Sequence, residues 1–325
     1  MENTTPLINW VLKNKKKLNI KVTRLNWTDS WLPGFHDYQT EMTIHDQTFI
    51  GRGTDQNEEL AFGKSISEIF EGLATSFSPI NAVTGIAAHP DINIAKENAY
   101  FELLAFDRAF FHYYSQIPFK IIDLSVLENK SQFEKIKFTL ENRDLCLNVY
   151  ELTPTLDAVI VVAFIWNYKI PNKGFVAGFG CSKNLNSATY HAVLECLRES
   201  VAIFIYNQPF PENLNNLFAN NRPEWHFWNN LNLNSLTYLQ TNLIKNPVTL
   251  LPTENINITS VNFNHVKEVN QMFEDLPIYV VSSASEKLIT PQFGNFSITE
   301  KNSERLSLFK KENIVINFSQ SHFYG

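Results

Sequence analysis

Residues 178–204 read GFGCSKNLNSATYHAVLECLRESVAIF, and two earlier stretches of the chain follow the same plan. These are GRGTDQNEELAFGKSISEIFEGLA at residues 51–74 and GIAAHPDINIAKENAYFELLAFDRAF at residues 85–110. Each stretch opens with a glycine-containing turn after an expected strand and continues through polar residues into a strongly periodic helix. We therefore predict an α/β fold built on three repeated units of strand, glycine turn and helix.

The three predicted helices also share a spacing of small and acidic residues. Each carries an alanine, then a small residue four positions later, then a glutamate three positions after that. These offsets place the three residues on one helical face, where small side chains allow close packing. Three such helices could aim three carboxylates at one place. The sets are Ala61-Ser65-Glu68, Ala95-Ala99-Glu102 and Ala188-Ala192-Glu195.

A cluster of carboxylates needs compensation. Glu71, three residues after Glu68, adds a further carboxylate. Two negative charges about 4 Å apart repel by roughly 4 kcal/mol at an effective dielectric near 20. Protonation, basic neighbours or a bound cation can offset this cost, and Mg²⁺ takes one or two carboxylates together with phosphate oxygens and water. The pattern favours a Mg²⁺–nucleotide site. The alternative is that the glutamates are exposed helix residues with coincidental offsets.

Composition excludes several classes of function. The 325 residues carry a formal charge of −6, with 44% hydrophobic and 18% charged residues. No global basic field favours nucleic-acid binding. The most apolar run covers residues 158–166 and is far too short to cross a membrane, which takes about 20 residues. Three scattered cysteines and the lack of a secretion signal favour a cytoplasmic protein.

Other segments give coarser predictions. The first ~50 residues alternate enough to suggest strands, with a turn at residues 32–34. Residues 158–166 are expected to form a buried strand, with residues 175–179 as its hairpin partner. A further buried strand is predicted at residues 277–281.

The three stretches resemble motifs of the YcaO family, ATP-dependent enzymes that act on peptide backbone amides. The first motif matches Lys64 to Gly72, and the second matches Thr84 to His89 followed by Glu102 to Asp107. The third matches His191 to Glu195, after Gly178-Phe179-Gly180. The resemblance covers roughly residues 40–300, which we take as a YcaO-like domain between an N-terminal segment (1–40) and a C-terminal tail (301–325).

The resemblance implies a nucleotide bound between repeated helices, with ATP and Mg²⁺ as cofactors. The expected reaction is attack of a nucleophile on a backbone carbonyl, with ATP phosphorylating the oxyanion, during ribosomal-peptide modification. Azoline, thioamide and amidine products all remain open. The implied metal ligands are Glu68, Glu71, Glu102 and Glu195. The implied nucleotide-binding residues are Lys64, Ser65, His191, Arg198 and Arg52.

The chain departs from the family pattern at several positions. Gly72, Phe106 and His191 stand where the family has arginines, and Ala105 stands at a glutamate. Lys64 stands at the serine of the first motif, although Ser65 adjoins it. The missing cations could be compensated in charge, but a lysine point charge does not replace an arginine fork; the candidates are Lys64, Arg198, Arg52 and Arg108. The alternative hypothesis is therefore a degenerate, non-catalytic scaffold or regulatory subunit.

The expected partners follow from the same resemblance. They are a precursor peptide and either a leader-binding accessory protein or a second YcaO-like subunit, and the resemblance is compatible with a homodimer. We expect neither nucleic acid nor membrane as a partner.

Overall fold

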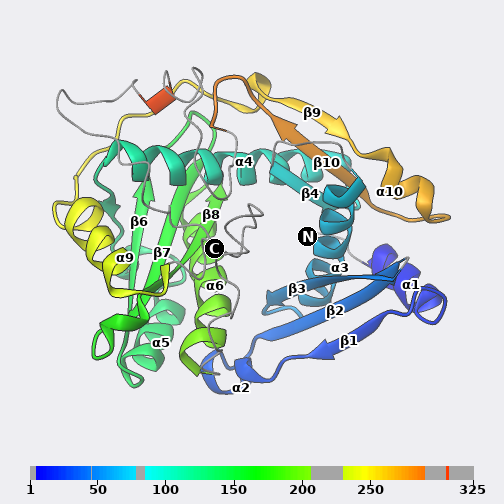
Figure 1. The fold of residues 1–325 in the computed structure, drawn as a ribbon, viewed down its shortest axis with the longest axis horizontal. Helices are drawn as coiled ribbons and strands as arrows, with labels where there is room; N and C mark the ends of the chain where they lie inside the picture. Colours follow the sequence, from blue (N-terminus) through cyan, green and yellow to red (C-terminus); the bar gives the residue numbers. More distant parts are fainter. Residues whose placement is uncertain (1–4, 45, 78–84, 206–229, 290–304, 307–325) are drawn as a thin grey trace. The chain divides into compact units, whose positions relative to one another are not determined.

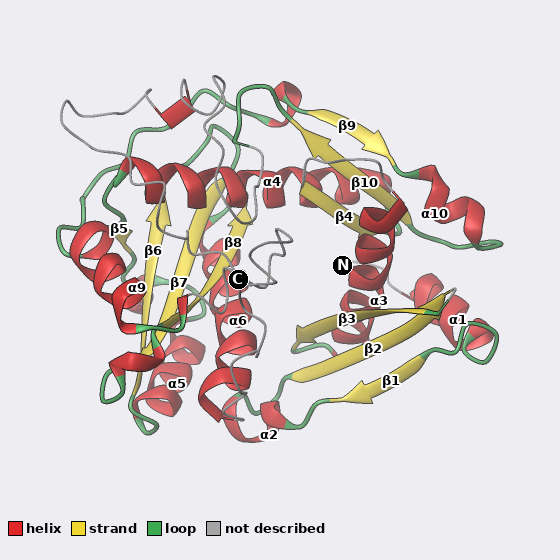
Figure 2. Cartoon of the chain, in the orientation of Figure 1, coloured by secondary structure: helices red, strands yellow, loops and turns green. Residues whose placement is uncertain are grey.

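The computed structural model describes residues 5–44, 46–77, 85–205, 230–289 and 305–306. The chain divides into two compact units, each mixing helices and strands (Figures 1 and 2). The first comprises residues 1–102 and 261–284, and the second comprises residues 103–260 and 285–325. The division falls inside helix α4 (Ile92–Ser115), which contributes residues to both units. The predicted domain limits at residues 40 and 300 remain predictions.

The first unit contains two antiparallel three-stranded sheets. One has the order β1-β2-β3, and the other has the order β4-β10-β9. The strands are β1 (Lys21–Arg24), β2 (His36–Ile44), β3 (Gln47–Asp55), β4 (Gly85–His89), β9 (Asn262–His265) and β10 (Tyr279–Ala284). The helices of this unit are α1 (Thr5–Asn14), α2 (Trp27–Trp31), α3 (Glu58–Phe77), α10 (Lys267–Met272) and the first part of α4. The strand predicted at residues 277–281 is present as β10, which begins and ends later, at Tyr279 and Ala284.

The prediction of strands near the N-terminus is wrong for its first part. Residues 5–14 form helix α1, which buries Leu7, Trp10 and Val11 at the i, i+3, i+4 spacing of an amphipathic helix. The Trp10 ring meets Phe70 and Phe273 edge-on, with ring centroids 6.1 and 5.8 Å apart. Burial of this aromatic surface fixes the helix on the core of the first unit.

The second unit is built on one antiparallel sheet of order β5-β6-β7-β8. Its strands are β5 (Lys120–Ile121), β6 (Leu145–Leu152), β7 (Val159–Asn167) and β8 (Phe175–Ser182). Its helices include α5 (Lys130–Glu141), α6 (Leu185–Ser200), α9 (Leu233–Tyr238) and the remainder of α4. Short helical turns lie at η1 (Leu124–Val126), η2 (Pro171–Lys173), η3 (Val201–Ile205), η4 (Leu239–Ile244) and η5 (Ile258–Ser260). The predicted hairpin of residues 158–166 and 175–179 is confirmed, because β7 and β8 pair antiparallel.

Glycines let helices lie directly on strands in both units. A Cβ atom added at Gly51 would stand 2.0 Å from the Ser65 carbonyl oxygen of α3. A Cβ added at Gly178 would stand 2.2 Å from the Cys196 nitrogen of α6. The small residues predicted on these helix faces therefore do face the strands, and the glycines complete the close approach.

We expect Gly178→Ala to lower the unfolding free energy by about 1–3 kcal/mol. The added methyl group would overlap the backbone of helix α6, which cannot rotate away. Gly72→Ala in α3 is the control. Its added methyl group would have Phe49 at 3.9 Å as the nearest atom, so it should be neutral or stabilising by up to about 1 kcal/mol. Urea denaturation of both variants measures the difference, and equal stabilities would contradict the close-packing argument.

A buried ionic network crosses the core of the second unit. Arg305 contacts the Asp107 carboxylate through Nε (3.0 Å) and Nη2 (2.6 Å), and contacts Glu254 through Nη1 (2.5 Å). Arg108 pairs with both carboxylates and donates from Nε to the Thr153 carbonyl at 2.6 Å. Burial alone would raise the pKa of Asp107, but the two guanidinium groups outweigh it and the pKa is lowered. Arg108, which the sequence offered as a compensating charge, is fully buried here.

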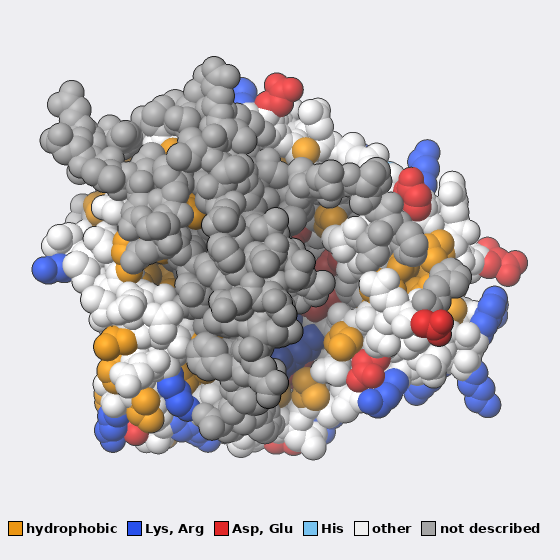
Figure 3. Space-filling model, in the orientation of Figure 1, with side chains coloured by type: hydrophobic (Ala, Val, Ile, Leu, Met, Phe, Trp, Pro, Cys, Tyr) orange, Lys and Arg blue, Asp and Glu red, His pale blue; other side chains and the backbone are white. Residues whose placement is uncertain are grey.

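Charged side chains of both signs lie on the face of the molecule that Figure 3 shows. In Figure 3, Lys/Arg and Asp/Glu side chains are interspersed over the region of α1 and β1. Within the described part of the chain, each helix is either too short or too polar to cross a bilayer.

Candidate functional site

Three predicted glutamates make the same hydrogen bond. Each accepts the backbone N–H of a residue 16 positions earlier, the residue that follows a glycine. The prediction of a glycine turn at these places is wrong, because the three glycines belong to strands β3, β4 and β8. Glu68 accepts from Arg52 at 2.8 Å, Glu195 accepts from Phe179 at 2.5 Å, and Glu102 accepts from Ile86. All three side chains are partly buried. The shared offsets therefore have a structural reason.

These hydrogen bonds cap the edges of sheets. Strands β3, β4 and β8 each stand at the end of their sheet, so their outer N–H groups have no neighbouring strand among the described residues. A carboxylate on the following helix takes the place of that strand and satisfies the donor. The sequence pattern alone did not predict that these carboxylates accept strand N–H groups. The constant distance from glycine to glutamate was the signal that could have revealed it.

The carboxylate cluster of the first unit consists of Glu68, Glu71 and Glu102. Glu71 accepts from the Ala88 N–H of β4 at 2.8 Å. Burial raises the pKa of Glu71 well above its usual value, and the charges of Glu102 and then Glu68 raise it further. The structure thus brings two of the other predicted ligands, Glu68 and Glu102, within electrostatic reach of Glu71. Glu195 lies in the second unit.

We expect Glu71→Gln to make the protein less sensitive to alkaline pH. A carboxyl group with a raised folded pKa favours folding below its unfolded pKa of about 4.3 and loses that contribution as pH rises through the folded value. Glutamine keeps an acceptor for Ala88 and cannot ionise. The stability of the variant relative to wild type, measured in urea, should therefore increase from pH 5 to pH 8. Unfolding free energies of wild type and variant that change in parallel with pH would contradict the raised pKa of Glu71.

Arg52, predicted to face phosphate, is engaged by a buried acid. Its Nε and Nη2 contact Asp37 Oδ2 at 3.0 and 2.7 Å, and Asp37 is fully buried. Thr54 donates to the same carboxylate at 2.9 Å, and the Trp27 indole donates to it as well. The guanidinium carbon lies 5.9 Å from the Trp27 ring centroid. These contacts give Arg52 a structural role within the first unit.

The other predicted nucleotide-binding residues also have local contacts. Lys64 pairs with Asp55 at 2.7 Å, and Ser65 is buried and shares a 2.7 Å hydrogen bond with Thr40. In the second unit, His191 is exposed on α6, and Arg198 contacts its neighbour Glu199 at 3.3 Å. None of these contacts tests a phosphate-binding role.

The departures from the family pattern lie partly in the core. Ala105 and Phe106 of α4 are buried at 7% and 3% exposure, where the family motif has a glutamate and an arginine. Cys181 and Cys196 flank the third predicted helix and are also buried, which raises the pKa of both thiols. Such thiols are poor nucleophiles near neutral pH.

The carboxylates of this site could bind Mg²⁺ only together with the phosphate oxygens of a bound nucleotide. No group of three or more His, Cys, Asp or Glu side chains within the described residues could hold a metal ion by itself. One or two carboxylates with phosphate oxygens and water are, however, the usual Mg²⁺ environment. Burial first, and then the charges of Glu102 and Glu68, raise the pKa of Glu71, and a bound cation would favour its charged form. The carboxylates present therefore fit Mg²⁺ bound together with a nucleotide.

Comparison with known proteins finds similarity in structure only. No protein-family model and no curated protein matches the sequence. The YcaO protein of Methanopyrus kandleri, solved with AMPPCP and Mg²⁺, is similar with a TM-score of 0.60 and 11% identity, over 88% of this chain and 91% of that one.

Two further solved structures are similar. A heterocyclase in complex with substrate and cofactor has a TM-score of 0.63 and 13% identity over 89% of this chain, which spans about half (53%) of the heterocyclase. A chain of the E. coli microcin synthetase McbBCD complex has a TM-score of 0.53 and 10% identity, over 78% of this chain and 85% of that one. The sequence prediction is thus confirmed for the architecture: the chain has the fold of the YcaO proteins and is a divergent example of it.

Proposed function

We propose that this protein binds Mg²⁺–ATP and uses it to activate a backbone amide of a ribosomally made peptide, as in azoline formation or a related modification. The carboxylate cluster of Glu68, Glu71 and Glu102 carries the proposal. Burial, and after it the charges of Glu102 and Glu68, raise the pKa of Glu71. Backbone N–H groups of strands β3 and β4 donate to the three carboxylates and hold them in place. Such preorganisation is expected of a cation site.

Each glutamate of the cluster has two roles in cation binding. One oxygen of each carboxylate accepts a strand N–H and fixes the side chain, while the carboxylate as a whole supplies negative charge toward a cation. Mg²⁺, when bound, would neutralise phosphate charge. We also propose Glu195 as a ligand, because it makes the same strand contact in the second unit. For the phosphate-facing residues we propose exposed His191 together with Arg198.

The partner class follows from the similar structures. The heterocyclase was solved with substrate, and the microcin synthetase is a complex of several proteins. We propose a precursor peptide as the substrate and an accessory protein or a second subunit as the partner.

Calorimetry with a non-hydrolysable ATP analogue tests the proposal. The purified chain should bind the analogue with micromolar affinity in the presence of Mg²⁺ and much more weakly in its absence. No binding at millimolar nucleotide would reject the proposed activity.

A second candidate function is a non-catalytic subunit with the same fold. It is supported by buried Ala105 and Phe106 and by the ion pairs that hold Arg52 and Lys64. In a reconstituted modification reaction, a Glu68→Gln chain would then support product formation as well as wild type does. Loss of product with that variant would reject this candidate.

A further inference from the structure

Strand β1 forms one edge of its sheet in the first unit. Among the described residues it pairs with β2 alone, and it lies on the side of β2 opposite to β3 (Figure 1). The Leu25 N–H donates to the Asp37 carbonyl at 2.8 Å, so the backbone groups of Leu25 face β2. Since successive residues alternate, Val22 and Arg24 direct their N–H and C=O groups away from β2.

The open part of this edge covers Val22 to Arg24. On its N-terminal side, the Ile20 N–H donates to the Lys15 carbonyl at 2.9 Å, and helix α2 begins shortly after its C-terminal side. Within the described ranges, neither Val22 nor Arg24 has a hydrogen-bond partner for its outward backbone groups. Both residues are accessible, because the Arg24 side chain is 44% exposed and Val22 is partly exposed. Unpaired edges of this kind are templates for a further strand.

A groove of about 800 Å³ meets this edge at Val22. Its lining includes apolar side chains from three elements, with Val22 and Tyr38 from the sheet, Ile8 and Leu12 from α1, and Phe62 from α3. Leu12 is 57% exposed, although α1 buries other apolar residues on the core. An accessible apolar groove of this kind marks a surface that a partner would cover.

The rim of the groove carries unbalanced charge. Glu58 and Glu59 of α3 line it together with Lys15, so carboxylates outnumber the ammonium group. The hydroxyl groups of Tyr38 and Thr5 donate to Glu58 and Glu59, respectively, but neither carboxylate forms an ion pair within the described residues. Two exposed carboxylates without a cation favour an occupant that carries Lys or Arg.

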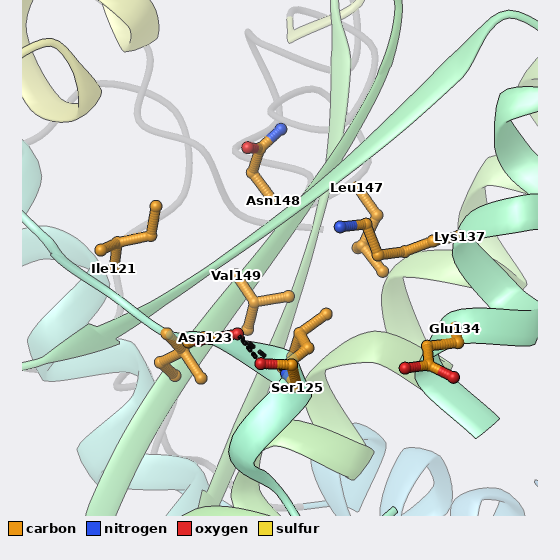
Figure 4. Close-up of a pocket in the computed structure, with 10 residues that line it drawn as sticks. Ile121, Asp123, Ser125, Glu134, Lys137, Leu147, Asn148 and Val149 are labelled. Carbon is orange, nitrogen blue, oxygen red and sulfur yellow. Dashed lines mark hydrogen bonds between the residues drawn. The ribbon is translucent and has the colours of Figure 1, made fainter. Parts of the chain in front are cut away.

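A cavity of the second unit lacks such an open edge. It has a volume of about 450 Å³, and η1, α5 and β6 line it (Figure 4). The strand residues Leu147 and Val149 in its lining are buried, with 7% and 2% exposure. Its Asp123 already accepts from the N–H and the hydroxyl of Ser125 (Figure 4). The groove of the first unit is therefore the better candidate for a docking site.

We propose that a short peptide in extended form adds to the sheet along β1. Its backbone pairs with Val22 and Arg24, one bulky apolar side chain enters the groove beside Leu12, and a neighbouring Lys or Arg meets Glu58 and Glu59. Backbone pairing supplies affinity and the groove supplies selectivity, as in other strand-addition sites. The proposal does not depend on nucleotide binding.

A second copy of the chain suits this edge less well. Twofold pairing would bring the exposed Lys21 and Arg24 of both copies close together, and like charges opposite one another destabilise a sheet. The open stretch is also short, about 10 Å at about 3.3 Å per residue. A stable dimer interface buries about 800 Å² on each partner, which favours a short peptide as the occupant.

Amide hydrogen exchange of the full-length chain tests the open edge. In the free protein, the amides of Val22 and Arg24 should exchange at least about tenfold faster than those of Thr23 and Leu25, which face β2. Protection of Val22 and Arg24 in the free protein would overturn the proposal, whether a second copy or another part of the chain covers them.

Selection of peptides on the full-length chain tests the occupant. Random dodecapeptides displayed on phage should yield sequences that combine a bulky apolar residue with a basic neighbour. Synthetic versions should bind with micromolar affinity and slow the exchange of the Val22 and Arg24 amides. Methylating alternate backbone nitrogens along one edge of the peptide should abolish binding, and methylating those of the other edge should not. Failure to select any peptide would overturn the proposal, as would binding that survives both methylation patterns.

A matched pair of variants localises the groove. Leu12→Lys should weaken peptide binding at least about tenfold, a loss of about 1.4 kcal/mol. Ile50→Lys is the control, because Ile50 is similarly exposed (60%) on β3 of the same unit and does not line the groove. Equal affinities of the two variants for the peptide would overturn the placement of the apolar side chain.

Exchanging charges on both partners tests the acidic rim. The double variant Glu58→Gln, Glu59→Gln should bind the basic peptide about tenfold more weakly than wild type does. A peptide with norleucine in place of its basic residue should bind this variant and wild type equally. Equal losses for the two peptides would overturn the proposed contact between the basic residue and the two carboxylates.

Discussion

Asp107→Asn is expected to destabilise the second unit by about 3–5 kcal/mol. The change leaves Arg108 and Arg305, both almost fully buried, with one carboxylate, Glu254, in place of two. It also weakens the acceptor for the Ile289 N–H, which now lies 2.7 Å from Asp107 Oδ1. Removing one partner of a buried ionic network is costly because the remaining charges stay desolvated.

The control is Asp29→Asn in the first unit. Asp29 pairs with Arg24 at 2.9 Å, but both side chains are about half exposed. A pair of this kind contributes at most about 1 kcal/mol. Urea denaturation of both variants gives the comparison, and a loss below about 1 kcal/mol for Asp107→Asn would show that the network does not stabilise the fold.

The same variant gives a pH dependence of known sign. Because the folded pKa of Asp107 is lowered, its contribution is present above the unfolded pKa of about 3.9 and is lost as pH falls through the folded value. The difference in unfolding free energy between wild type and Asp107→Asn should therefore persist from pH 7 to about pH 5 and disappear below about pH 4. A free-energy difference that increases as the pH falls would contradict the lowered pKa of Asp107.

Glu68→Gln is expected to weaken Mg²⁺-dependent nucleotide binding by about 100-fold or more, with little change in stability. Losing an outer partner of a metal ligand already costs about 10–100-fold, and this change removes a proposed ligand charge directly. Glutamine still accepts the Arg52 N–H, so the edge of β3 stays capped. Alanine would leave that N–H without its acceptor, at a cost of about 1–3 kcal/mol, and so would confuse folding with binding.

Glu59→Gln is the matched control on the same helix. Glu59 is exposed in the first turn of α3 and accepts a hydrogen bond from the Thr5 hydroxyl. Calorimetry should find wild-type affinity for this variant, and thermal unfolding should find all three proteins within a few degrees of one another. Wild-type binding by Glu68→Gln would remove Glu68 from the proposed ligands. Glu195→Gln is tested in the same way, since Gln keeps the contact with Phe179.

The sequence by itself determined the three helices that carry Glu68, Glu102 and Glu195, and it determined the β7–β8 hairpin. These predictions succeeded because they depend on local periodicity, and periodicity reports directly which face of a helix or strand is buried. The glycines before α3 and α6 were also visible, since only glycine allows the observed contact of strand and helix backbones.

Helix α1 depends on both a local pattern and distant contacts. Leu7, Trp10 and Val11 have helical spacing, although the prediction of strands over the first ~50 residues includes them. The residues that bury it, Phe70 and Phe273, lie far away in sequence. Packing against distant residues decided the outcome.

Only the tertiary structure decided what the charged residues do. Arg52 was a candidate for phosphate binding until its partner, the buried Asp37, came from a neighbouring strand. Arg108 and Arg305 lie nearly 200 residues apart and meet the same carboxylate. The pKa of Glu71 likewise depends on burial and on Glu102 from another helix. Charge pairing and desolvation act through space, and a sequence pattern gives the distance along the chain alone.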